Sequence, residues 1–110
     1  MKILIINENL AKNNGESNIS EARVAITPDL VGKYQKLGIE VYVQSNAGLL
    51  SGFDNIQYSN QGAKIVDNIS QILPSVDAVL AVTSNNIDWS LCQPNTLFIS
   101  ILIPLAISLL

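Results

Sequence analysis

The sequence predicts an α/β fold with an open, mostly parallel sheet and helices on both faces. Short β-branched apolar runs alternate with segments of helical spacing along the 110 residues, and this alternation is typical of parallel sheets. Apolar residues make up 48% of the chain and charged residues only 14%, which indicates extensive buried surface. A chain of this length can form one substantial hydrophobic core but not a second, so we expect a single domain.

The first half of the chain contains the clearest elements. Lys2 to Ile6 is a continuous β-branched run, as expected for a strand that is buried on both faces of a parallel sheet. Glu8 to Glu21 is polar and rich in asparagine, which favours a long loop. A helix is predicted from Thr27 to Gly38, because the threonine can cap its first turn, a proline occupies its first position and the glycine suits its end. Ile39 to Gln44 is the second strand and completes a βαβ unit.

The second half of the chain repeats this alternation with shorter segments. Asp54 can cap a short helix that runs toward Gly62, and Asp77 to Val82 is predicted as a buried strand. The remaining predictions are a small-residue loop at 45–52, a strand at 63–66, a helical turn at 69–73 that Pro74 ends, a helical turn through Trp89 and Leu91, and a strand at 96–102.

Charge and composition exclude several kinds of partner and site. The net charge is −3 and the six basic residues are scattered along the chain, whereas nucleic acid binding needs a clustered positive field. With no histidine and only Cys92, neither an internal disulfide nor a zinc site of the usual kind can form. The apolar run at 3–6 is too short for a signal peptide, and the apolar stretch at 98–110 is too short for a bilayer span, which needs about 20 residues. We therefore expect a cytoplasmic chain with no nucleic acid partner, no metal and no membrane span of its own.

No nucleotide-binding or catalytic motif is present in the sequence. The six glycines never have the Gly-x-Gly-x-x-Gly spacing that admits a pyrophosphate, and no Gly-Lys-Ser/Thr phosphate loop occurs. No serine has a histidine partner, and the carboxylates have no paired spacing. The sequence thus predicts no catalytic residue and no cofactor-binding residue within these 110 residues.

One segment is a candidate ligand site, because Arg23, the only arginine, lies just before the predicted helix N-terminus. An arginine there adds a planar bidentate donor to the anion-favouring end of a helix, which suits a carboxylate ligand. The alternative is an ordinary ion pair of Arg23 with Glu21 or another nearby carboxylate. A second candidate, Asn46-Ala47-Gly48, either lets a ligand approach the backbone or forms a plain turn.

Five sequence blocks together resemble the opening of the alanine dehydrogenase / NAD(P) transhydrogenase alpha-subunit family. They follow the first strand in the order Glu21-x-Arg23-Val24-Ala25-Ile26-Thr27-Pro28, Leu37-Gly38-x-Glu40-Val41, Ser45-x-Ala47-Gly48, Phe53-Asp54-x-x-x-Tyr58 and Gly62-Ala63-x-Ile65-Val66. The resemblance covers residues 1–104 and assigns them to the N-terminal domain of the family, with 105–110 as an apolar tail. It implies half of a flavodoxin-like or Rossmann-like domain, truncated before the nucleotide-binding fold of the family.

The resemblance also implies roles for particular residues. Arg23 occupies the position of the arginine that binds the substrate carboxylate in alanine dehydrogenases. The substrate-binding lysine of the family is replaced here by Ala81, and the catalytic histidine of the dehydrogenases by Ile103. Both replacements argue against alanine dehydrogenation and favour the transhydrogenase branch, although that branch also has the lysine.

The implied function is that of the N-terminal part of an NAD(P)+ transhydrogenase alpha subunit. In that branch the subunit binds NAD(H) and passes hydride to NADP(H) on another subunit, coupled to proton translocation at the cytoplasmic face of the membrane. The resemblance implies other transhydrogenase segments or subunits and a second copy in a homodimer as partners. The 110-residue chain alone is expected to be inactive and to bind neither cofactor.

Two alternatives belong to other functional classes. The first is a non-catalytic remnant or interaction module of the same family. The second is a receiver-like signalling domain, which is disfavoured because no acidic pair follows the first strand and no lysine ends the last one.

Overall fold

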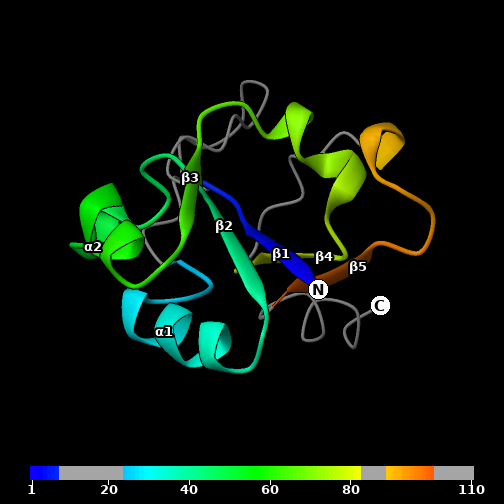
Figure 1. Cartoon of the computed structure of the whole chain (residues 1–110). Helices are drawn as coiled ribbons and strands as arrows, with labels where there is room; N and C mark the ends of the chain where they lie inside the picture. The colour runs from blue at the N-terminus through cyan, green and yellow to red at the C-terminus, as the bar shows by residue number, and fades with distance from the viewer. Residues whose placement is uncertain (8–23, 83–88, 101–110) are drawn as a thin grey trace, which may run out of the picture.

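The computed structural model describes residues 1–7, 24–82 and 89–100. Its centre is a five-stranded sheet in which every strand pair is parallel (Figure 1). The strands lie in the order β3-β2-β1-β4-β5, so β1 is central and β3 and β5 form the two edges. Their bounds are β1 Lys2–Ile5, β2 Glu40–Gln44, β3 Lys64–Val66, β4 Ala78–Ala81 and β5 Leu97–Ser100.

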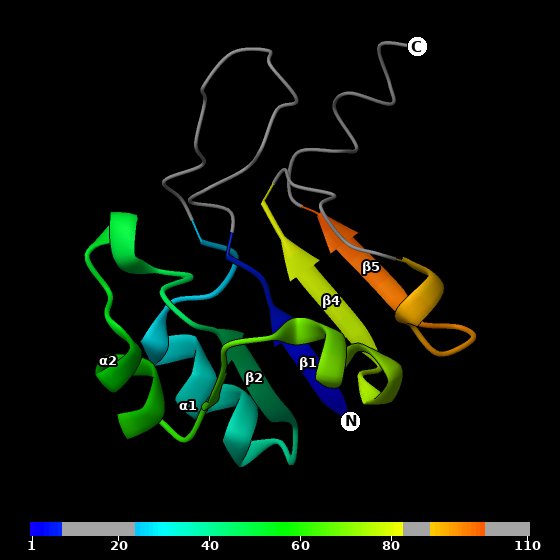
Figure 2. The same cartoon turned by 90° about the horizontal axis from the view of Figure 1, so that it is seen from above.

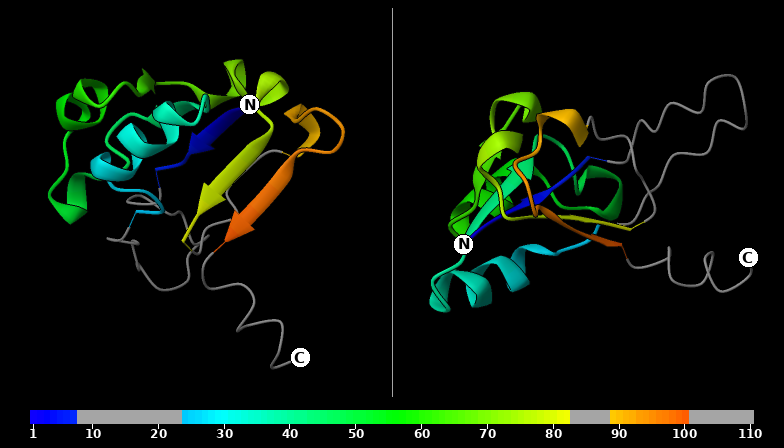
Figure 3. Two further views of the ribbon diagram at one scale, coloured as in Figure 1. Left: turned by 60° about the horizontal axis from the view of Figure 1, so that its bottom comes forward. Right: turned by 90° about the vertical axis from the view of Figure 1, so that its right-hand side faces the viewer.

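Helices accompany both faces of the sheet, but the two faces differ in kind. One face is covered by α-helices, α1 (Pro28–Lys36) and α2 (Asn55–Asn60). Among residues 1–7, 24–82 and 89–100, the helices that cover the opposite face are 3-10 helices, and Figure 3 shows them on the side of the sheet away from α1. These are η2 (Ile69–Gln71), η3 (Leu73–Ser75) and η4 (Trp89–Leu91), while a further one, η1 (Leu49–Ser51), lies between β2 and α2. The predicted fold class is confirmed.

The strict alternation of side chains along the strands separates two hydrophobic clusters. The α-face cluster, on the side of α1 and α2, joins strand residues to the helices and is formed by Ile3, Ile5, Val41, Val43 and Ala78 with Val31, Tyr58 and others. The 3-10-face cluster, on the other side, is formed by Leu4, Ile6, Tyr42, Val79 and Ala81 with Leu73 and Val76. Because β1 contributes buried residues to both clusters, its continuous apolar run follows from its central position.

The ends of the two α-helices show which of the predicted capping residues make capping hydrogen bonds. Asp54 caps α2 through a reciprocal pair of hydrogen bonds: its Oδ1 accepts from the Gln57 amide at 2.9 Å, and Gln57 Oε1 accepts from the Asp54 amide at 2.9 Å. Thr27 precedes α1 as expected, but its side chain makes no capping hydrogen bond, contrary to the prediction. Pro28 has no amide to cap and its fixed φ already favours a helical start. At the other end, Gly38 takes the left-handed conformation, with φ 82°.

The largest local difference from the prediction is at residues 69–75. A single helical turn ended by Pro74 was expected, whereas two successive 3-10 helices occur and Pro74 lies inside the second. A proline is accepted there because the first positions of a helix need no amide donor. At the last strand, residues 97–100 agree with the prediction, and residues 101 and 102 lie outside the described part of the chain.

None of the helices in the described residues has the length and apolar character that crossing a bilayer requires.

Candidate functional site

The order of the strands places the candidate site at the carboxyl edge of the sheet. From β1 the chain proceeds outward to β2 and β3, then returns past β1 to β4 and β5. The order therefore reverses between β1 and β4, and open α/β sheets bind ligands in the crevice at the carboxyl ends of such strands. Asn7 follows β1 at this edge, and Val82 follows β4. Figure 2 shows both strands ending on the same side of the molecule.

Amide side chains connect the carboxyl ends of β1 and β2. The Asn7 backbone amide donates to Gln44 Oε1 at 2.7 Å, and Asn7 Nδ2 donates to the Ser45 carbonyl oxygen at 2.9 Å. Asn55 extends the connection to α2, because its Nδ2 donates to Ser45 Oγ at 3.0 Å and its Oδ1 accepts from the Asn46 amide at 2.8 Å. These polar groups hold the strand ends and loops in place through protein–protein hydrogen bonds.

Tyr58 fixes the segment that leads into α1. This side chain of α2 is 0% exposed, and its hydroxyl donates to the Ile26 carbonyl oxygen at 2.7 Å across 32 residues of sequence. Ile26 is itself buried, and Val24 and Ala25 pack partly buried against the α-face cluster. A buried carbonyl needs such a donor because an unpaired one is costly. The hydrogen bond thus sets the path of residues 24–27 at the carboxyl edge.

Gly48, in the loop after β2, lies directly against the Tyr58 side chain. A Cβ placed on Gly48 would lie 2.6 Å from the Tyr58 hydroxyl oxygen, 2.8 Å from its Cε2 and 3.1 Å from Phe53 Cβ. The Phe53 and Tyr58 rings meet edge to face with centroids 6.4 Å apart. Asn46, with φ 64°, supplies the left-handed residue of the turn. The Asn46-Ala47-Gly48 segment is therefore a turn, and the absent side chain of Gly48 makes room for Tyr58.

The predicted ligand-binding residue, Arg23, lies outside the described residues, as do Glu21 and Ile103. Ala81 is described and lies at the carboxyl end of β4, where it is 1% exposed within the 3-10-face cluster. A buried methyl group can neither donate a hydrogen bond nor carry charge. Of the positions that the resemblance assigns to substrate binding, the structure describes position 81, which lies at the carboxyl edge and is apolar. The role of Arg23 stays a prediction.

Sequence reasoning missed the hydrogen bond between Tyr58 and Ile26. The signal was present in two of the quoted blocks, because Phe53-Asp54-x-x-x-Tyr58 contains its donor and Arg23-Val24-Ala25-Ile26 contains its acceptor. The spacing within each block indicates local structure only, and the contact joins the two blocks through the fold.

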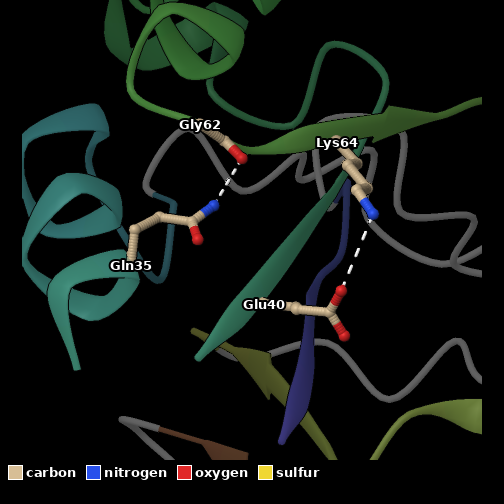
Figure 4. A network of polar contacts seen from close by, with 4 residues as sticks. All are labelled: Gln35, Glu40, Gly62 and Lys64. Atoms are coloured by element: carbon tan, nitrogen blue, oxygen red, sulfur yellow. Dashed lines mark hydrogen bonds and ion pairs between the residues drawn. The ribbon is translucent and has the colours of Figure 1, made fainter. Parts of the chain in front are cut away.

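A second polar network lies at the amino ends of β2 and β3, away from the candidate site (Figure 4). Gln35 Nε2 donates to the Gly62 carbonyl oxygen and so ties α1 to the turn before β3. Lys64 Nζ lies 3.7 Å from Glu40 Oε1 and 5.5 Å from the centre of the Tyr42 ring. Both charged side chains are largely exposed, so the ion pair contributes little to stability. No group of three or more metal-ligating side chains occurs in the described residues.

Burial of the hydroxyl raises the pKa of Tyr58 from 10.0 to about 12. Between pH 10 and pH 12 the folded chain therefore keeps a proton that the unfolded chain has released. The contribution of the protonated Tyr58 to the free energy of unfolding is fully present below pH 10 and is lost as the pH rises through the folded pKa. Between the two pKa values the free energy of unfolding falls by about 1.4 kcal/mol for each pH unit.

We predict that the free energy of unfolding falls steeply across this pH range, as measured by denaturant titration at a series of pH values. In Tyr58→Phe, which has no hydroxyl at this position, this part of the decline should disappear. Tyr34 and Tyr42 remain in that variant and serve as the internal control. An equally steep decline in Tyr58→Phe would assign the alkaline transition to other groups.

Comparison with known proteins identifies the family. The family model described as "Alanine dehydrogenase/PNT, N-terminal domain" matches residues 14–108. The chain belongs to this family. Among curated relatives, "Alanine dehydrogenase 1" of Staphylococcus aureus (strain Mu50 / ATCC 700699) is 52% identical over 46 residues. These residues are 42% of this chain and 12% of the relative, so the aligned part is a small share of that protein.

Two solved structures of the alanine dehydrogenase/PNT family share the fold. An L-alanine dehydrogenase superposes with a TM-score of 0.72 and 26% identity, over 91% of this chain and 26% of its own. The transhydrogenase from Sinorhizobium meliloti gives a TM-score of 0.74 and 26% identity, over 94% of this chain and 29% of its own. The chain therefore spans between a quarter and a third of the length of these structures. By name, both relatives are oxidoreductases, so the family is one of oxidoreductases.

Proposed function

We propose that this chain is the N-terminal part of an NAD(P)+ transhydrogenase alpha subunit, in which NAD(H) is bound and hydride is transferred to NADP+. Ala81, a buried methyl group at the carboxyl end of β4, argues against alanine dehydrogenation. An alanine dehydrogenase must hold a small carboxylate substrate by charged or hydrogen-bonding side chains, and this position offers neither. The choice of branch rests on Ile103, because the resemblance places a catalytic histidine at this position in the dehydrogenases and none in the transhydrogenase branch.

We propose that Tyr58 and the segment at 24–27 form one side of the ligand site and position Arg23 there. Tyr58 holds the Ile26 carbonyl oxygen at 2.7 Å and so fixes the segment that Arg23 precedes in the sequence. Arg23 is proposed to bind an anionic group at the carboxyl edge through its bidentate guanidinium. NAD(H) and NADP(H) would be held by other segments of the enzyme, since the sequence has no glycine-rich pyrophosphate turn. In this proposal residues 1–104 form the N-terminal domain and 105–110 a tail.

Two chimeras test the proposal. In one, this chain replaces the matching N-terminal segment of the Sinorhizobium meliloti transhydrogenase, and in the other that of the Staphylococcus aureus alanine dehydrogenase. We expect hydride transfer between NADH and an NADP+ analogue in the first chimera. In the second we expect no pyruvate-dependent oxidation of NADH, because Ala81 cannot replace a substrate-binding lysine.

Binding of NADH by each chimera, measured by fluorescence titration, shows that its nucleotide-binding fold is intact. Ala81→Lys in the second chimera is the matched variant, and any recovered pyruvate reduction would identify position 81 as the deficient one. An active second chimera without that substitution, together with a folded but inactive first one, would reverse the proposed branch. If both folded chimeras are inactive, the chain is a non-catalytic module and the proposal fails.

A further inference from the structure

Ser45, directly after β2, is the residue at which the carboxyl ends of three strands and α2 are joined. Its backbone amide donates to the Val66 carbonyl oxygen of β3 at 2.8 Å. Its own carbonyl oxygen accepts from Nδ2 of Asn7, which follows β1, at 2.9 Å. Its hydroxyl oxygen accepts from Asn55 Nδ2 of α2 at 3.0 Å. Each group of Ser45 bonds to a different element, so the positions of β1, β3 and α2 at this edge depend on one another.

Asn55 holds this junction from the first position of α2. Besides the bond to Ser45, its Oδ1 accepts from the Asn46 backbone amide at 2.8 Å, so one side chain bonds to two successive residues of the turn. Asn46 has φ 64°, a left-handed conformation that is uncommon for residues other than glycine. A fixed acceptor for its amide helps to keep the turn in this conformation. Asn55 therefore holds both the Ser45 side chain and the backbone of the turn.

The same helix reaches a second segment at the carboxyl edge. Tyr58 lies three residues after Asn55, on the same side of α2, and its hydroxyl donates to the Ile26 carbonyl oxygen at 2.7 Å. One short helix thus fixes the end of β1, through Asn55 and Ser45, and the segment at 24–27, through Tyr58. Open α/β sheets bind ligands at this edge, beside the strand where the order reverses, which here is β1.

We propose that Asn55 is a positioning residue for the hydride transfer of the whole enzyme, an inference that rests on the proposed function. It acts through the Ser45–Asn46 turn and through Asn7, which it keeps in place at the carboxyl ends of the strands. Groups that surround a reacting ligand must be held to within about 0.5 Å, and hydrogen bonds behind them provide this precision. The affinity for NADH is set elsewhere, because in the proposed function other segments of the enzyme hold the nucleotides.

Steady-state kinetics of the transhydrogenase chimera test this role. Asn55→Ala removes both hydrogen bonds to the turn and should lower kcat by about 10- to 100-fold. The KM for NADH should stay within about threefold of that of the parent chimera. The kcat is expressed per NADH-binding site, counted by fluorescence titration, so that a loss of folded enzyme does not affect it. Asn55→Asp keeps an acceptor for the Asn46 amide and can accept from the Ser45 hydroxyl, so it should restore most of the lost activity.

Gln57→Ala is the matched control, because it weakens α2 without changing the turn. Gln57 Oε1 accepts from the Asp54 amide at 2.9 Å in the capping box of α2. In the part of the chain that the structure describes, Gln57 makes no hydrogen bond to Ser45 or Asn46. The variant should have the kcat and the KM of the parent chimera. An equal loss of activity in Gln57→Ala and Asn55→Ala would overturn the inference, since the stability of α2 would explain both.

Amide hydrogen exchange of the 110-residue chain tests the same link without the other segments of the enzyme. In Asn55→Ala, exchange should become faster at the Asn46 amide and also at the Asn7 amide, which donates to Gln44 Oε1 at 2.7 Å and is linked to the turn through Ser45. Unchanged exchange at Asn7 would overturn the inference, because the effect of Asn55 would then end at the turn. An inactive parent chimera would overturn the proposed function and this inference with it. An active parent with an equally active Asn55→Ala variant would overturn this inference alone.

Discussion

Replacing Tyr58 with alanine is expected to lower the free energy of unfolding by about 3–5 kcal/mol, the range for truncating a buried aromatic side chain. Tyr58 is 0% exposed and contributes to the α-face cluster, so its removal leaves a cavity between α2 and the sheet. The Ile26 carbonyl oxygen also loses the donor that lies 2.7 Å away. Because small domains have a total stability of only about 5–15 kcal/mol, the variant should unfold at much lower urea concentrations.

A second substitution separates the two parts of this effect. Tyr58→Phe keeps the ring and removes only the hydroxyl, so we expect a loss of about 1–3 kcal/mol from the unpaired carbonyl. Tyr34→Ala serves as the control, since Tyr34 is partly buried against the same cluster and should cost less than Tyr58→Ala. Urea unfolding monitored by circular dichroism measures all three variants. If Tyr58→Ala cost less than Tyr34→Ala, Tyr58 would not be the anchor of the segment at 24–27.

The sequence was sufficient to predict the elements whose signals are local. The strands at residues 2–5, 40–44 and 78–81 follow from short apolar runs, and α1 follows from proline at its start and Gly38 after its end. The capping box of α2 has donor and acceptor within Asp54 and Gln57, which lie three residues apart. Each of these features depends on neighbours in the chain, so the pattern alone determines it.

Other features depend on contacts between distant segments, and the sequence pattern carries no record of them. The division of the sheet into an α-helical face and a 3-10 face follows from the direction of each crossover, which only the strand order reveals. Residues 69–75 have the composition of a helical turn, but the short path over the 3-10 face gives two tight turns instead. The link from Tyr58 to Ile26 spans 32 residues. Gly48 leaves room for the Tyr58 side chain, and this role could not be predicted from the sequence because it depends on that link.

Replacing Gly48 with alanine is expected to lower the free energy of unfolding by about 3 kcal/mol, the upper part of the range for overpacking a core. The backbone of Gly48 has φ −99°, which any residue can adopt, so the cost is steric. Its new methyl group would lie 2.6 Å and 2.8 Å from two atoms of the fully buried Tyr58 side chain, which has no free space to move into. Urea unfolding measures the loss.

Gly32→Ala is the matched control, because its methyl group would also meet an atom at 2.6 Å. That atom is Oε1 of the exposed Gln61 side chain, which can rotate away, so the substitution should stabilise α1 by up to about 1 kcal/mol. Equal contact distances should thus give effects of opposite sign. In a Tyr58→Ala background the cost of Gly48→Ala should vanish, because the methyl group then enters the cavity. A cost that persists there would mean that Phe53, 3.1 Å away, is the obstructing neighbour.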